Sequence, residues 1–200
     1  MTNETNKPDM LLWVDVETTA LEPLEGQLLE IGMGVTGMDG STLREFRTWL
    51  IRHKDIMLNP TTMHAVNMHT ENHLIEQTFE NGETKGTTAI MIQTYLAALA
   101  GKYTLHPAGT NVDFDITWLR SSLGLQLDSL HYRKLDMSSL RMVMRELCLG
   151  AYAHQPTTHR VEDCISRDLD EYRNLLSAFG QMLDKDMDNP CQTTTAVETR

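Results

Sequence analysis

Two acidic residues near the N-terminus have the type and spacing of a metal site. Asp15 and Glu17 lie two positions apart at the end of the apolar run at residues 10–17, which predicts a buried strand. Side chains at i and i+2 of a strand project from one face, so the two carboxylates can converge on one cation. Carboxylates at the end of a buried strand are costly to desolvate unless a cation lies between them. The alternative is an ordinary pair of surface acids.

A second acidic group lies at residues 111–115, between a predicted strand at 103–106 and a predicted helix at 116–123. Sheets of alternating strands and helices place their sites at the ends of central strands, so an acid here can reach the same site. Asp113 and Asp115 compete for that role. We expect Asp113 to cap the helix instead.

The third signal begins the predicted helix at residues 159–179. His159 and Asp163 are four positions apart, which places them on one face of a helix. Acids from three segments favour Mg²⁺ or Mn²⁺ over zinc, and two such ions about 3.5–4 Å apart can activate water and stabilise the leaving oxygen of a phosphodiester. Histidine accepts protons near neutral pH, so His159 is the candidate base, although a lone histidine is more often a surface residue.

The surrounding pattern predicts an α/β fold with a mixed central sheet flanked by helices. Strands at 27–36 and 42–51 are joined by a turn containing Asp39 and Gly40, which is typical of a hairpin. Further helices are predicted at 67–79, 88–99 and 138–149, the last one capped by Asp136 or Ser138. We expect one domain at residues 10–180, with flexible tails at 1–9 and 181–200.

Composition narrows the class of protein. The 200 residues include 28 acidic and 17 basic ones, and a net charge of −11 argues against broad neutralisation of duplex phosphates. Three scattered cysteines, Cys148, Cys164 and Cys191, form no C-x-x-C pair and indicate a reducing, cytoplasmic location. No apolar run approaches the ~18 residues of a membrane span, and no secretory signal is evident.

The acidic segments resemble the motifs of a known family. Residues 13–23 (WVDVETTALEP) and 28–31 (LLEI) are similar to the first motif of DEDDh exonucleases, and residues 109–119 and 159–172 are similar to the second and third. Residues 131–140 (HYRKLDMSSL) resemble a segment of oligoribonucleases that proofreading exonucleases of the superfamily lack. The chain is therefore identified as an oligoribonuclease-like member of the DEDDh 3′→5′ exonuclease superfamily.

The resemblance implies an RNase H-like fold, a homodimer and two Mg²⁺ or Mn²⁺ ions held by Asp15, Glu17, Asp115 and Asp163. It implies that His159 is the general base and that short single-stranded RNA is cleaved from its 3′ end to 5′-mononucleotides. Long duplexes and membranes are not expected partners. The substrate-binding residues that it implies are Leu21, His69, Asn111, Tyr132, Arg133 and Ser138, with Tyr132 and Arg133 acting across the dimer interface.

The third motif departs from the family pattern. The metal-binding aspartate usually lies five residues after the histidine, and here that position is Cys164. We expect Asp163 to be the metal ligand after a local shift of the helix start, and we do not expect Asp168 to take that role.

The other account is that the fourth carboxylate is missing, which would leave a weak enzyme or a binding module for oligonucleotides or a partner protein. A single-stranded DNA exonuclease is the remaining alternative. His64 replaces a family tryptophan, which affects one base-stacking contact.

Overall fold

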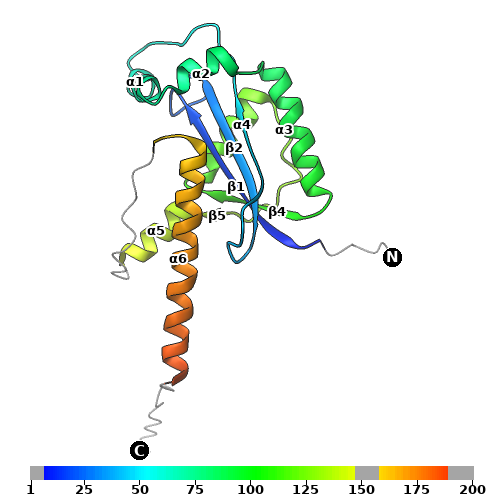
Figure 1. The fold of residues 1–200 in the computed structure, drawn as a ribbon, viewed down its shortest axis with the longest axis vertical. Coiled ribbons are helices and arrows are strands. Elements are labelled where there is room, and N and C mark those ends of the chain that lie inside the picture. The colour runs from blue at the N-terminus through cyan, green and yellow to red at the C-terminus, as the bar shows by residue number, and fades with distance from the viewer. Residues whose placement is uncertain (1–6, 147–157, 189–200) are drawn as a thin grey trace, which may run out of the picture.

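The structure, a computed structural model, describes residues 7–146 and 158–188 and centres on a five-stranded mixed sheet (Figure 1). The strand order is β3-β2-β1-β4-β5. β1 pairs antiparallel with β2 and parallel with β4, so it lies in the middle of the sheet. The strands are β1 (Asp9–Thr18), β2 (Leu28–Gly37), β3 (Arg44–Leu50), β4 (Thr104–Gly109) and β5 (Leu135–Asp136).

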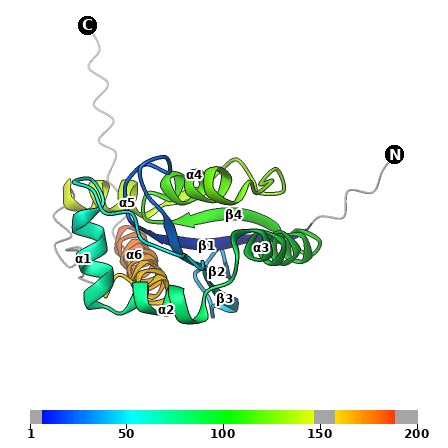
Figure 2. The same cartoon turned by 90° about the horizontal axis from the view of Figure 1, so that it is seen from above.

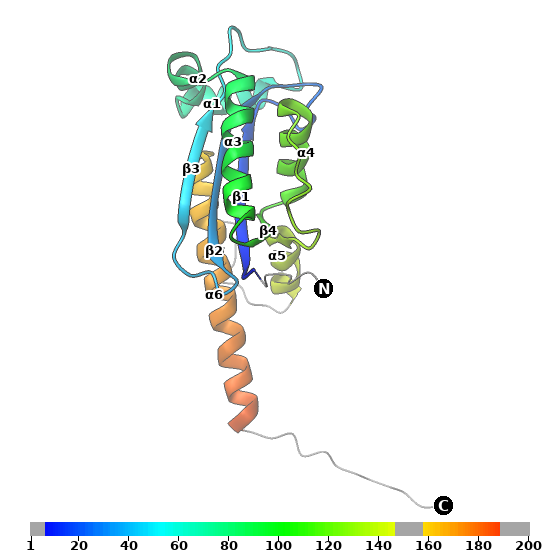
Figure 3. The ribbon, with the colours of Figure 1, turned by 90° about the vertical axis from the view of Figure 1, so that its right-hand side faces the viewer.

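Helices cover both faces of the sheet, as Figures 2 and 3 show. One apolar core joins the sheet to α3 and α4, and a second joins it to α5 and α6. The predicted mixed sheet flanked by helices is therefore confirmed. The helices are α1 (Met63–Glu71), α2 (Leu74–Asn81), α3 (Lys85–Ala100), α4 (Val112–Leu123), α5 (Met137–Glu146) and α6 (Val161–Asp188).

The side chains of Asp15 and Glu17 lie on the face of the sheet that α6 covers. Leu12, Val14 and Val16 belong to the core under α3 and α4, whereas Leu11 and Trp13 belong to the core under α6. Because side chains alternate between the faces of a strand, the next two residues on the α6 face are Asp15 and Glu17. The strand thus changes from apolar to acidic along one face.

The N-terminal turn of α6 is held against the sheet by a glycine and an ion pair. A Cβ atom at Gly32 of β2 would lie 2.7 Å from Cβ of Val161, so only glycine permits this approach. Arg160 donates two hydrogen bonds to the buried Glu30 carboxylate, at 2.8 and 2.9 Å. These contacts fix the helix start beside the acidic end of β1.

One predicted helix is divided in two. The pattern at residues 67–79 indicated a single helix, but the structure ends α1 at Glu71 and begins α2 at Leu74. His73 between them has φ +61°, and the Asn72 side chain accepts a hydrogen bond from the Leu74 N–H. An Asn side chain that binds nearby backbone competes with helix continuation, which accounts for the break.

The last helix of the structure extends past the predicted end of the domain. α6 continues to Asp188, past the predicted domain end at residue 180, and extends beyond the sheet in Figure 1. Most of the predicted tails, residues 1–6 and 189–200, and the last part of the helix predicted at 138–149 lie outside the described residues. Among the helices that are described, none is long and apolar enough to cross a membrane.

Candidate nuclease and metal site

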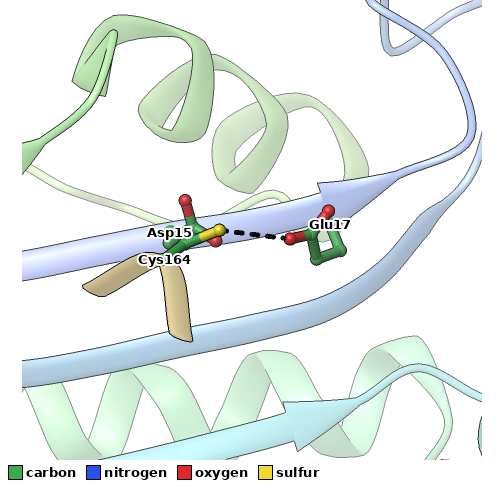
Figure 4. A group of neighbouring side chains, drawn as sticks. All are labelled: Asp15, Glu17 and Cys164. Atoms are coloured by element: carbon green, nitrogen blue, oxygen red, sulfur yellow. Dashed lines mark hydrogen bonds between the residues drawn. The ribbon is translucent and has the colours of Figure 1, made fainter. Parts of the chain in front are cut away.

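The structure brings together two carboxylates and a thiol at the end of β1. One ligand atom each from Asp15, Glu17 and Cys164 lie within 4.8 Å of one another (Figure 4). Cys164 Sγ donates to Glu17 Oε1 at 3.7 Å. The strand supplies the acids from i and i+2, and the first turns of α6 supply the sulfur. The convergence of Asp15 and Glu17 on one point is therefore observed.

Asp115 approaches the same group from α4, while Asp113 does not. Asp115 is 2% exposed, and its Oδ1 accepts a hydrogen bond of 2.9 Å from the Val16 N–H. The pairing of β1 with β4 ends at Trp13, so the Val16 N–H lies beyond the residues of β1 that pair with β4. The prediction that Asp113 caps this helix was wrong, because the N-cap residue of α4 is Asn111, and Asp113 lies within the first turn, exposed and paired with Lys134. Of the two competing aspartates, Asp115 is the one beside the acidic pair.

The electrostatics of the cluster favour a bound cation. Burial and the neighbouring Asp115 and Glu17 charges raise the pKa of Asp15 well above its ordinary value. Burial and the Glu30 charge raise the pKa of Glu17 to about 7. Burial is also the main cause that raises the pKa of Asp115. Without a cation these groups retain protons because their charged forms repel one another in a poorly solvated place.

Two buried carboxylate oxygens lack a hydrogen-bond partner, which is a second reason to expect a divalent ion here. Within the described part of the chain, Oδ2 of Asp15 and Oδ2 of Asp115 are buried without a hydrogen-bond partner. Buried polar atoms are normally satisfied, so two orphaned carboxylate oxygens in one cluster require another partner. Carboxylate oxygens are the ligands that hard divalent cations prefer. The residues present therefore fit a metal ion.

The structure places Cys164, and not Asp163, in the cluster. Asp163 is exposed, and its carboxylate accepts a hydrogen bond from the Thr158 hydroxyl. Cys164 is 6% exposed and faces Glu17. The expected shift of the helix start, which would turn Asp163 inward, is absent from the described residues, because Val161 packs on Gly32 and Arg160 is anchored by Glu30.

His159 lies on a cleft that reaches Glu17. The cleft has a volume of about 510 Å³, and Glu17, Leu21, His64, His69, Phe114 and His159 are among its lining residues. His159 has φ +53°, a conformation that histidine tolerates better than most residues. Its carbonyl oxygen accepts a hydrogen bond of 3.0 Å from Asn72 Nδ2. The break between α1 and α2 therefore helps to position the candidate base.

His69 contacts Glu17 from inside the protein. It is fully buried, and its Nε2 atom lies 3.5 Å from Glu17 Oε2. Burial lowers its pKa to about 4, so the ring is neutral at physiological pH. The two atoms are in contact but form no hydrogen bond, because His69 Nε2 has no hydrogen-bond partner among the described residues. The sequence predicted a substrate-binding role for His69, and the structure places it beside a candidate metal ligand.

The other predicted substrate residues lie around the entrance or farther away. Leu21 is 80% exposed on the cleft, and Trp118 Nε1 donates to its carbonyl oxygen at 3.3 Å.

Tyr132 is 74% exposed and stacks on His131. The Arg133 guanidinium lies over the Tyr132 ring, 5.2 Å from its centroid. The backbone N–H groups of Asn111 and Ser138 both donate to Asp136, at 3.1 and 2.8 Å. Asp136, one of two proposed caps, therefore caps α5.

Sequence reasoning missed a buried ionic network behind the cluster. Asp168 is 2% exposed and accepts hydrogen bonds from Thr110, Arg141 and Arg167, each at 2.7 Å. Its charge raises the pKa of Asp15 and of Asp115, so it lies near both. Asp168 follows Cys164 by four residues, and that helical spacing was the available signal. Its oxygens are occupied by donors, so Asp168 orients α6 without being available as a fourth ligand.

A pH dependence of stability follows from the raised pKa of Glu17. The folded state binds a proton at Glu17 up to pH about 7, whereas an unfolded glutamate releases it near 4.5. The folded state thus holds more protons, and metal-free stability falls as pH rises from 4.5 to 7, by up to about 3 kcal/mol from this group. Glu17→Gln should remove that part of the decrease. Urea unfolding with chelator across this range tests it, and parallel wild-type and variant curves would contradict it.

The chain has an RNase H-like fold, in which the acidic residues lie at the end of the central strand. It is similar to E. coli exonuclease I in a zinc-bound complex with single-stranded DNA, with a TM-score of 0.68 and 13% identity over 90% of the chain. It is also similar to an exonuclease I in its apo form, with a TM-score of 0.66 and 13% identity over 91% of the chain. The chain spans 43% and 45% of the lengths of these two proteins.

The sequence is also similar to those of bacterial oligoribonucleases. The chain is 27% identical to the oligoribonuclease of Actinobacillus pleuropneumoniae over 82% of its own length and 90% of that protein. It is 28% identical to an oligoribonuclease of Mycobacterium sp. over 74% of its length and 69% of that protein. No protein-family model matches the chain. The predicted similarity to oligoribonucleases and the predicted RNase H-like fold are therefore confirmed.

Proposed function

We propose that the protein is a metal-dependent 3′→5′ exoribonuclease that hydrolyses short oligoribonucleotides to 5′-mononucleotides. The observation that carries this proposal is the convergence of Asp15 and Glu17 at the end of the central strand, next to a cleft lined by His159. Asp115 lies beside them, because it accepts a hydrogen bond from the Val16 N–H between the two acids. Oligoribonucleases among the relatives support the substrate class. The net charge of −11 also supports it, because long strands require a basic track.

Asp15, Glu17 and Asp115 would hold two divalent cations. When bound, such ions activate water and stabilise the leaving oxygen of a phosphodiester. His69, buried with its Nε2 atom 3.5 Å from Glu17 Oε2, would limit the positions open to that carboxylate by contact. Mg²⁺ or Mn²⁺ suits the oxygens that these three residues offer.

The residues of the cleft have separable roles. His159 would accept the proton of the attacking water, because its ring is exposed on the cleft that also reaches Glu17. Leu21, on the same cleft, would pack against a base of the substrate. The exposed Tyr132 and Arg133 would hold the 5′ end of a dinucleotide bound to a second copy of the chain, since Arg suits phosphate by its two-pronged geometry. We place this homodimer in the cytoplasm.

His159→Ala is the test of the proposed base. We expect kcat for an RNA dinucleotide to fall by about 10²–10⁴-fold, with KM little changed, because proton acceptance is lost and binding is retained. The matched control is His73→Asn, at an exposed position outside the cleft with φ +61°, a conformation that Asn tolerates. The control should retain wild-type kcat. Equal kcat values for His159→Ala and wild type would contradict the assignment.

Substrate preference separates the proposal from its alternatives. The wild type is incubated with an RNA dinucleotide and with long single strands of RNA and DNA, in Mg²⁺, Mn²⁺ or chelator. Fastest metal-dependent cleavage of the dinucleotide supports the proposal. Preference for long DNA would instead indicate a DNA exonuclease, and one structural neighbour is an exonuclease I in complex with single-stranded DNA. Binding of the dinucleotide without cleavage in any metal would indicate a binding module.

A further inference from the structure

Cys164 is a chemical anomaly at the point where the carboxylates converge. Its sulfur lies within 4.8 Å of a carboxylate oxygen of both Asp15 and Glu17, and all three side chains are directed toward one another in Figure 4. A thiol that served only as packing would be expected among apolar side chains. Here its hydrogen-bond acceptor is a carboxylate, Oε1 of Glu17, at 3.7 Å.

Glu17 is poorly satisfied in the metal-free cluster. Its Oε1 accepts a weak hydrogen bond from the Cys164 thiol, and its Oε2 lies 3.5 Å from His69 Nε2, an atom with no hydrogen-bond partner among the described residues. The buried Oδ2 atoms of Asp15 and Asp115 have no partner within the described residues. Replacing the thiol proton by a divalent ion would satisfy Glu17 and Asp15 together, and the displaced proton would pass to solvent.

We propose that the Cys164 thiolate is a metal ligand beside Asp15 and Glu17, so that this position selects a thiophilic divalent ion such as Zn²⁺ or Co²⁺ over Mg²⁺. The inference rests on the proposed function, because it names the ion that this nuclease site would take. Its physical basis is that sulfur ligands favour softer ions, while Mg²⁺ prefers an all-oxygen environment. It replaces the expectation of an all-carboxylate site with a mixed sulfur and oxygen set.

Spectroscopy of bound Co²⁺ tests the ligand without requiring activity. The full chain, with Cys148→Ser and Cys191→Ser so that Cys164 is the only thiol, is stripped of metal and titrated with Co²⁺. We expect a sulfur-to-cobalt charge-transfer band in the near ultraviolet. Cys164→Ser should abolish the band and weaken Co²⁺ binding at least about tenfold, since a direct ligand is lost.

Two further variants make the outcome decisive. Cys164→Asp should abolish the band and shift the Mg²⁺-to-Co²⁺ affinity ratio toward Mg²⁺ by at least about tenfold. Asp163→Asn should retain the band. The proposal is overturned if Co²⁺ binds without the band, or if Asp163→Asn weakens binding and Cys164→Ser does not. A band without cleavage of any oligonucleotide would contradict the proposed nuclease function and keep the ligand assignment, whereas cleavage without a band would do the reverse.

Discussion

Asp115→Asn should lower kcat for an RNA dinucleotide by at least about 10³-fold, which corresponds to about 4 kcal/mol of transition-state stabilisation. Asparagine retains an oxygen for the 2.9 Å hydrogen bond from the Val16 N–H, so the local backbone should remain in place. It removes the charge from the buried, unpartnered Oδ2 position that we assign to a cation. The loss should therefore be in metal binding and chemistry, with the thermal midpoint of the metal-free protein unchanged or raised.

The neighbouring aspartate provides a matched control in the same turn of α4. Asp113→Asn changes the same chemical group two residues away, where the side chain is exposed and pairs only with Lys134 among the described residues. Exposed ion pairs contribute little, so activity should remain within about twofold of wild type. Steady-state kinetics and calorimetric Mn²⁺ titration of both variants measure the difference. Similar losses in the two variants would show that the turn as a whole, rather than the Asp115 carboxylate, is required.

The sequence predicted the parts of the site that depend on strand periodicity. Asp15 and Glu17 lie on one face because alternation is a property of every strand, and the apolar run before them indicated a buried position. The hairpin turn was also predictable, because Gly40 adopts φ +68° as an Asp-Gly turn requires. Such features depend on neighbouring residues alone, so one sequence suffices to predict them.

The position of Cys164 could not be derived in this way. Rotation of α6 decides whether residue 163 or 164 faces β1, and distant contacts set that rotation. The Arg160 guanidinium pairs with Glu30, 130 residues earlier in the chain, and Val161 packs on Gly32. The sequence shows no pairing of these segments. The motif spacing placed cysteine in the ligand position, and the expectation of a carboxylate there favoured Asp163.

The ionic network around Asp168 was missed for a related reason. Charged residues on a helix are usually solvated, so Arg141, Asp168 and Glu171 have the pattern of an ordinary surface. Burial comes from the packing of α5 against α6 and the sheet, which joins Met137, Ile165 and Leu169 in one core. Once the two helices pack, the charges between them must pair with one another.

Arg141→Met should lower the free energy of unfolding by about 3–5 kcal/mol, because it leaves buried charge without its partner. The Arg141 guanidinium lies 2.6 Å from Oε2 of Glu171 and 2.7 Å from Oδ1 of Asp168, and the three side chains are 13%, 9% and 3% exposed. Asp168 retains Arg167 and Thr110 in the variant, so Glu171 is the group left uncompensated. Urea unfolding with an unchanged m-value would measure the loss.

Arg145→Met is the control for Arg141→Met, since it lies one turn later on α5. Its side chain is 76% exposed and its distance to Glu146 is 3.9 Å, so stability should change by less than about 0.5 kcal/mol. Adding Glu171→Leu to Arg141→Met should recover most of the lost stability, because the orphaned carboxylate is removed. Equal stability of the Arg141 and Arg145 variants would contradict the prediction.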